Sequence, residues 1–107
     1  MAKVFLTQQQ PRHDTSPAKE FGDIVTVYPP NTQVYGDTPH FVDVARRFLR
    51  NADEDDFILP LGDPVLGAIL TMVMCEKFGI VNILKFDRKT KSYSSYLIDI
   101  EVQPIGA

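Results

Sequence analysis

The sequence of 107 residues contains a single cysteine, Cys75. One cysteine cannot form an internal disulfide, so the count argues against a disulfide-stabilised secreted domain and favours a reducing cytosol. Long hydrophobic runs are also missing, because the longest, Val65–Cys75, has 11 residues and a membrane span needs ~20. The apolar start of the chain turns polar at Gln8, which is too early for a signal peptide. We therefore expect a cytoplasmic protein.

An excess of basic charge is absent as well. The chain has 11 Lys and Arg against 14 Asp and Glu, a net charge of −3. This balance argues against a globally basic nucleic-acid-binding protein, although it allows a local basic patch. The hydrophobic fraction of 44% and the charged fraction of 23% are typical of globular proteins. The length predicts a single domain over residues 1–107.

Residue patterns for catalysis and metal binding are also lacking. His13 and His40 have no cysteine or serine in a recognisable nucleophile motif, and Cys75 falls in an apolar segment where a thiol is normally inert. There are too few Cys and His residues for a metal site of that type. Neither Gly-x-Gly-x-x-Gly nor a P-loop is present. The sequence therefore predicts a non-enzymatic protein without a cofactor or a bound metal.

The order of predicted elements is β-β-α-β-α-β-β. Short β-branched and aromatic runs predict the strands, and apolar positions at helical spacing predict the helices. We expect strands at residues 3–7, 24–28, 57–61, 80–86 and 96–102, and helices at residues 39–50 and 64–78. Thr38 is the expected N-cap of the first helix, with Pro39 at its first position. Residues 8–22 are predicted to form a long flexible loop. The fold class is α/β: a compact domain with a mostly parallel central sheet, in which strands 2, 3 and 4 are parallel, and an antiparallel C-terminal hairpin.

The second helix has the clearer boundaries. Asp63 can cap its start, Pro64 suits its first position, and Gly79 follows its end. Its apolar residues lie on nearly every side, which predicts a buried helix. A row of small residues, through which another backbone could approach closely, recurs every four positions: Gly67, Thr71 and Cys75.

In the fifth strand, apolar and polar residues alternate, which predicts one buried and one wet face. The alternation assigns Tyr96, Ile98, Ile100 and Val102 to the buried face. Tyr93 falls on the opposite face and is therefore expected to be accessible.

Two similar turns form the first candidate site. Gly36-Asp37-Thr38-Pro39 precedes the first helix, and Gly62-Asp63-Pro64 precedes the second. In an open α/β sheet both turns lie at the carboxyl edge of the strands, where ligands commonly bind. Asp37, Thr38, Gly62 and Asp63 are thus candidate ligand-binding residues, and two carboxylates could hold Mg²⁺ with a substrate phosphate. The alternative is that both turns are helix caps, which the capping preference of Asp favours.

Basic residues form the second candidate site. Lys85, Arg88, Lys89 and Lys91 lie around the C-terminal hairpin turn, with Tyr93 beside them. Basic charge interleaved with aromatic rings can bind single-stranded nucleic acid, whereas the alternative is a soluble turn that protects a sheet edge. The first helix adds a face for a partner or for solvent, composed of Arg46, Arg47 and Arg50.

Three strings carry a resemblance to a known group of proteins. Tyr28-Pro29-Pro30 follows a strand, Leu59-Pro60-Leu61-Gly62-Asp63-Pro64 opens a helix, and Leu84-Lys85-Phe86-Asp87-Arg88 precedes a tyrosine. Over about residues 20–102 the chain resembles small tailed-phage proteins with a Leu-Pro-x-Gly-Asp-Pro turn and a Leu-Lys-Trp-Asp-Arg hairpin. Here Phe86 replaces the usual Trp. The resemblance implies a viral origin and a location in the host cytoplasm, and it assigns no site residues.

Three functions are compatible with these patterns. The first is a non-enzymatic phage accessory protein that binds a host protein or single-stranded nucleic acid through the basic hairpin and the arginine face. The second is a protein that binds a small ligand, such as a nucleotide, at the Gly-Asp-Pro helix N-termini. The third is a structural or homo-oligomeric virus protein that uses the fifth strand or the row at Gly67. No membrane partner is expected.

Overall fold

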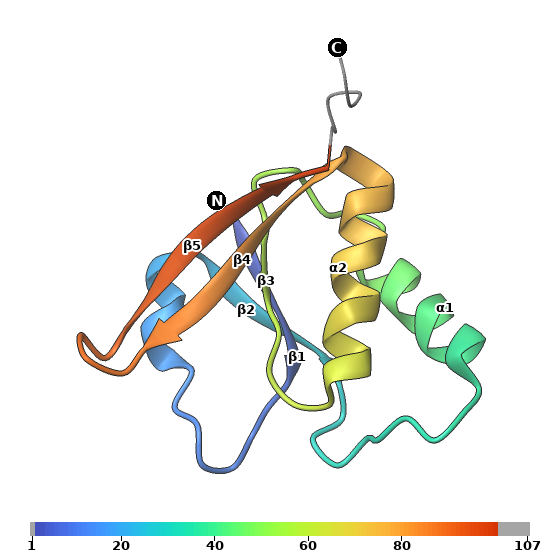
Figure 1. Cartoon of the computed structure of the whole chain (residues 1–107), viewed down its shortest axis with the longest axis horizontal. Coiled ribbons are helices and arrows are strands. Elements are labelled where there is room, and N and C mark those ends of the chain that lie inside the picture. Colours follow the sequence, from blue (N-terminus) through green and yellow to red (C-terminus); the bar gives the residue numbers. More distant parts are fainter. Residues whose placement is uncertain (1, 101–107) are drawn as a thin grey trace, which may run out of the picture.

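The computed structural model describes residues 2–100, and Val102 of the predicted fifth strand lies outside them. The elements follow one another as β1 Lys3–Gln8, the 3-10 helix η1 Ser16–Glu20, β2 Asp23–Tyr28, α1 Thr38–Phe48, β3 Phe57–Leu59, α2 Pro64–Phe78, β4 Ile80–Asp87 and β5 Ser92–Asp99. The predicted α/β class, the element order and the antiparallel C-terminal hairpin are confirmed (Figure 1).

The five strands form one sheet in the order β2-β1-β3-β4-β5. Strands β2, β3 and β4 are parallel, as predicted, but β1 lies between β2 and β3 and pairs in parallel with both. Its residues Val4, Phe5 and Leu6 are buried on both faces, which is typical of a central parallel strand.

Both faces of the sheet are covered, but to different extents. Helices α1 and α2 pack on one face, around a core cluster that includes Phe5, Ile58 and Val81. The shorter η1 contributes Ala18 to a second cluster on the other face. Right-handed crossovers that run in opposite directions along a sheet fall on opposite faces. The connection from β1 to β2 therefore covers one face, and the connections that lead to β3 and β4 cover the other.

The segment for which the sequence predicts a long flexible loop, residues 8–22, has more regular structure than expected. Gln8 belongs to β1, and Ser16–Glu20 form η1. Ala18 in the middle of η1 is completely buried. A small side chain fits between the sheet and the single helical turn of η1. The segment is too short to show a helical periodicity in the sequence, but it still contributes a core residue.

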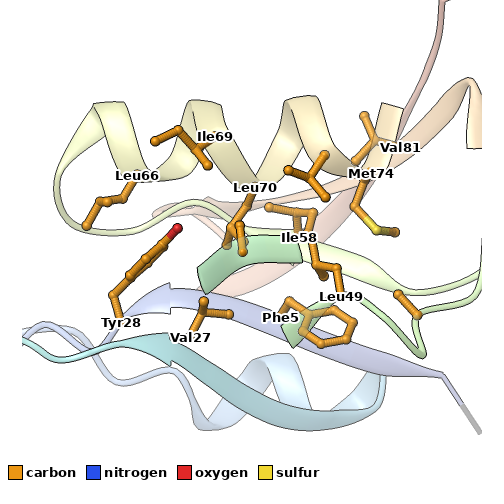
Figure 2. Packing of buried hydrophobic residues seen from close by; sticks show 13 residues of the cluster. Phe5, Val27, Tyr28, Leu49, Ile58, Leu66, Ile69, Leu70, Met74 and Val81 are labelled. Carbon is orange, nitrogen blue, oxygen red and sulfur yellow. The ribbon is translucent and has the colours of Figure 1, made fainter. Parts of the chain in front are cut away.

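Helix α2 supplies more buried residues to the core on its face of the sheet than any other element does (Figure 2). Leu66, Leu70 and Met74 are completely buried. The helix is not buried on every side, however, because Val65 is 41% and Met72 is 69% exposed. The predicted burial is therefore confirmed for the sides of α2 that face α1 and the sheet, and no described element covers its outer side.

The small-residue row on α2 is occupied by the chain itself. A Cβ atom at Gly67 would lie 3.1 Å from Cβ of Pro60 in the loop after β3. Farther along the row, the Thr71 hydroxyl donates a hydrogen bond to the Gly67 carbonyl at 2.9 Å. The close approach that the row allows is therefore an intramolecular contact between α2 and the end of β3.

The burial predicted for one face of the fifth strand is wrong. Tyr96, Ile98 and Ile100 are 54%, 46% and 47% exposed. The alternation itself is regular, since Tyr96 pairs with Ile83 and Ile98 pairs with Val81 on the face where the helices lie. Helix α2 packs on β4 and does not reach the edge strand, so no element within residues 2–100 covers these side chains. Within residues 2–100, no helix is long and apolar enough to cross a membrane.

Candidate functional site

A crevice opens where the carboxyl ends of β1 and β3 meet. The chain leaves β1 toward β2 on one side and passes to β3 on the other, so the direction of the connections reverses at this point. Open α/β sheets commonly bind ligands at such a switch point. The crevice has a volume of about 680 Å³. Its lining comes from residues 30–33 and 61–64 together with Gln8, Gln10, Pro11 and His13.

Gln8, at the end of β1, organises this crevice. Its side chain is 1% exposed. The carbonyl Oε1 accepts a hydrogen bond from the Asp63 backbone N–H at 2.7 Å. The amide Nε2 donates to the carbonyls of Thr32 at 2.7 Å and Pro29 at 3.0 Å. One buried amide thus connects β1 to the loops after β2 and β3, and the sequence interpretation missed it because it placed Gln8 in a loop.

Asp63 serves two loops at once. Its Oδ1 accepts from the Val65 N–H at 2.8 Å, which caps α2 as predicted. Its Oδ2 accepts from the Val34 N–H at 2.9 Å, in the loop after β2. These hydrogen bonds, the Val34 bond first, lower the pKa of the Asp63 carboxyl. The carboxylate therefore fixes the wall of the crevice, and both of its oxygens have partners within the protein.

The turn before α1 does not contribute to the crevice. Asp37 occupies the N-cap position with φ 53°, and its side chain makes no cap hydrogen bond. Thr38, which the sequence predicts as the cap, is instead the first residue of the helix. Neither residue lines the crevice, whereas Gly62 and Asp63 do. The structure therefore does not bring the four predicted residues together, because the loop after β2 carries the turn of Asp37 and Thr38 away from the sheet edge. A role of any of the four in ligand binding stays a prediction.

This separation leaves the crevice with one carboxylate in place of a pair. Within the described part of the chain, no three His, Cys, Asp or Glu side chains are grouped so that they could hold a metal ion. The capping carboxylate also occupies N–H groups of α2 that an anion would need. The remaining lining is mostly uncharged and polar, which suits a ligand that exchanges hydrogen bonds with amides.

The basic hairpin projects from the sheet between β4 and β5. Its four cations, Lys85, Arg88, Lys89 and Lys91, are all exposed, as predicted. The Lys89 N–H donates to Oδ1 of Asp87 at 2.8 Å, and Lys91 adopts a φ of 55° that closes the turn. This hydrogen bond uses the backbone N–H of Lys89 and not its side chain. The four cationic side chains therefore remain in solvent.

A groove of about 400 Å³ lies beside the hairpin on the η1 face. Its lining comprises Arg12, His13, Asp14, Pro17, Phe86, Lys91 and Tyr93. The Phe86 and Tyr93 rings meet edge to face, with centroids 5.2 Å apart. Burial, followed by the charge of Asp14, raises the pKa of the Tyr93 hydroxyl. Because η1 carries the preceding segment under the sheet, Arg12 joins the hairpin, although the sequence interpretation assigned it no role.

The two hairpin tyrosines are reversed relative to the prediction. Tyr93, expected to be accessible for stacking, is 4% exposed, and Tyr96, expected in the core, is 54% exposed. Tyr93 lies under η1, and Tyr96 lies on the face that α2 leaves open. A smaller hollow of about 210 Å³ contains Tyr96 together with Lys85 and Arg88. Of the two tyrosines, the accessible one beside the cations is therefore Tyr96.

The arginine face of α1 is partly engaged within the chain. Arg46 forms an ion pair with Glu76 of α2 at 3.1 Å, and Arg47 pairs with Asp43 at 3.7 Å. Arg50 lies just after α1 and is exposed. Exposed pairs of this kind contribute little to stability and open readily. The face therefore presents fewer free cations than the sequence suggests, and the hairpin is the stronger basic candidate.

These features define a small α/β protein with a 2-1-3-4-5 sheet, a polar crevice at the switch point and a basic hairpin beside an aromatic groove. The family model described as Phage Pam3 gp32-like protein matches residues 2–100. The chain therefore belongs to this family of phage proteins, as the resemblance to phage proteins predicts. No curated protein and no solved structure matches the chain.

Proposed function

We propose that this phage protein acts by binding and not by catalysis, and that its basic hairpin binds single-stranded nucleic acid in the host cytoplasm. The observation that carries the proposal is the groove whose lining combines Arg12 and Lys91 with the Phe86 ring. Cations along a groove can follow a phosphate backbone, and an aromatic wall accepts a base of any sequence. Lys85 and Arg88 beside Tyr96 repeat this combination on the other face of the hairpin.

The net charge of −3 makes such binding local and sensitive to salt. Each phosphate contact on a single strand contributes about 0.7 to the slope of log affinity against log salt. We expect the double variant Arg12→Ala, Lys91→Ala to reduce this slope by about 1.4. Fluorescence anisotropy with labelled oligo-dT and oligo-U, titrated from ~20 mM salt upward, measures it.

Arg50→Ala is the matched control. It removes an exposed cation that lies outside both hairpin hollows, so the salt slope should stay as in the wild type. If the wild type binds neither oligonucleotide at ~20 mM salt, where charges act over more than ~20 Å, the nucleic-acid proposal is wrong. An acidic protein surface would then be the better candidate for the hairpin and for the face formed by Arg46, Arg47 and Arg50.

The crevice supports a second candidate function, the binding of a small polar ligand. The observation in its favour is the position of a hollow of about 680 Å³ at the switch point of the sheet. A panel of nucleosides, nucleotides and other small polar metabolites tests it by thermal shift, because a ligand that binds only the folded state raises Tm.

Variants that spare the structural residues Gln8 and Asp63 make this test specific. Gln10→Ala and Asn31→Ala change two amides in the lining, and each should reduce any ligand-dependent rise in Tm. Asn51→Ala removes an exposed amide outside the lining and should leave that rise unchanged. If no compound raises the Tm of the wild type, the small-ligand function is excluded for the panel.

A further inference from the structure

Strand β5 is an edge strand with apolar side chains on both faces. It pairs only with β4 among the described strands. Tyr96 and Ile98 point to the face of the helices and are 54% and 46% exposed, and Leu97 points to the other face and is 61% exposed. Adjacent apolar residues exposed on both faces of an edge indicate a surface that becomes covered.

The outer edge of β5 also presents backbone N–H and C=O groups that could pair with another strand. The Ile100 N–H donates to the Gly79 carbonyl at 3.0 Å, and the register continues one-to-one from there to the turn. In an antiparallel ladder the bonded residues alternate, so the even-numbered residues of β5 face β4. The N–H and C=O groups of Ser95 and Leu97 therefore point outward, away from the sheet.

The usual protections of an edge strand are missing here. Natural edges are commonly interrupted by lysine, proline or a bulge. Ser92–Asp99 contains neither lysine nor proline, and its register with β4 has no bulge. Its one charged residue, Asp99, lies at the end of the strand. The edge is therefore open to another strand along its apolar stretch.

We propose that β5 binds β5 of a second copy of this chain, antiparallel, about a two-fold axis that passes through Leu97. In this register Leu97 lies opposite Leu97 of the second copy, and Tyr96 lies opposite Ile98 twice by symmetry. Directly opposite residues share a face of the sheet, so aromatic and aliphatic side chains meet on the helix face and the two leucines meet on the other. The two sheets become one continuous sheet.

Charge favours a second copy as the occupant. Asp99 lies opposite Ser95 of the second copy, and the two Asp99 residues are separated by four positions, about 14 Å along the strands. No like charges meet in the pairing. A two-fold axis perpendicular to the sheet also keeps both pairs of helices on one face, and α2 leaves space there because it packs on β4. The strand is thus complementary to itself in apolar pattern, charge and backbone.

The first test measures the oligomeric state of the whole chain by sedimentation equilibrium, from roughly 1 µM to 500 µM. We expect a concentration-dependent dimer in the wild type. Leu97→Lys places two like charges on the axis, and dimerisation should weaken at least tenfold. Met72→Lys adds the same charge at a comparably exposed site on α2 and should dimerise as the wild type does. A wild type that stays monomeric throughout, or equal dimerisation of both variants, would overturn the proposal.

The second test checks the register by oxidation in a Cys75→Ser background. Leu97→Cys brings two cysteines together across the axis at a Cα separation near 5.5 Å, within reach of a disulfide. Ser95→Cys, on the same face, leaves its two thiols about 14 Å apart. Rapid dimer cross-linking of the first variant and slow cross-linking of the second are expected. Equal rates, or the reverse order, would exclude this register, and capture of a strand from a different protein would replace the second copy as the occupant.

Discussion

The turn before α1 and the turn before α2 have similar sequences, Gly36-Asp37-Thr38-Pro39 and Gly62-Asp63-Pro64, but they hold their helices differently. Asp63 caps α2 and also binds the loop after β2, while Gln8 supports the same turn from β1. Asp37 caps nothing. Helix α1 is instead fixed from below, because the Tyr28 hydroxyl donates to the Phe41 carbonyl at 2.6 Å. The shared motif predicts the start of a helix in both places. The surrounding loops decide which side chains form the hydrogen bonds that hold each helix start.

The two glycines should show the largest difference. Gly62 has a φ of +94°, and a Cβ atom there would collide with Oε1 of Gln8, whereas nothing lies within 4 Å of a Cβ at Gly36. We expect Gly62→Ala to lower the free energy of unfolding by about 3 kcal/mol, from backbone strain and displaced hydrogen bonds. Gly36→Ala should change it by less than about 0.5 kcal/mol. Urea unfolding measures both, and equal losses would contradict the contrast between the turns.

Gln8→Leu should have the next largest effect. It removes the partners of the Asp63 N–H and of the Thr32 carbonyl at a site that is 1% exposed. Buried polar groups without partners cost about 1–3 kcal/mol, so we expect a loss of about 2 kcal/mol in urea unfolding. Gln10→Leu, in the lining of the same crevice, serves as the control and should stay within about 0.5 kcal/mol. A similar loss in both variants would mean that Gln8 does not hold the second turn.

Tyr28→Phe tests the support of the first helix and should cost about 1 kcal/mol, the value of one hydrogen bond. Burial raises the pKa of Tyr28 to about 12, above about 10 for an unfolded tyrosine. The contribution of Tyr28 is therefore complete below about pH 10 and is lost as the pH rises toward 12. Stability of the wild type should fall over this window relative to Tyr28→Phe. Tyr35→Phe, at a side chain 92% exposed, should retain the alkaline loss of the wild type.

Asp63→Asn should give the smallest effect, since the amide oxygen still accepts one of the two hydrogen bonds. The pKa of Asp63 is lowered by its bonds to the Val34 and Val65 N–H groups. The stabilisation by the carboxylate is therefore present above about pH 4, the unfolded value, and is lost as the pH falls through the lower folded pKa. The difference in urea midpoint between wild type and variant should be constant near neutrality and shrink below about pH 4. Asp37→Asn should leave the midpoint at pH 7 unchanged.

Patterns within single elements predicted much of this fold. Asp63, Pro64 and Gly79 fixed both ends of α2, because caps depend on neighbours in the sequence. The alternation of apolar residues and the order of the elements predicted that β4 and β5 form an antiparallel hairpin and that β3 is parallel to β4. The central place of β1 could not be predicted in the same way, since its partner β3 is set by the packing of distant segments.

At the candidate sites, most errors arose because the sequence does not show which face of each strand a helix covers. Alternation correctly placed Tyr93 and Tyr96 on opposite faces of β5, but it could not tell which face α2 or η1 would reach. The same limit applies to the crevice. Gln8 carried a signal, a polar residue directly after an apolar strand, whereas Asp37 repeated the motif of Asp63 and lay elsewhere.

The central position of β1 also constrains the order in which the chain can fold. Strands β4 and β5 form a local hairpin, which can close within microseconds. By contrast, the ladder between β1 and β3 joins Val4 to Phe57, and such long closures slow folding because their entropy is lost before the contacts form. Until β3 pairs with it, β1 has one unpaired edge along the apolar residues Val4, Phe5 and Leu6. We therefore expect folding to be limited by the insertion of the three-residue strand Phe57–Leu59, which joins a parallel pair on one side to a hairpin that can form early on the other.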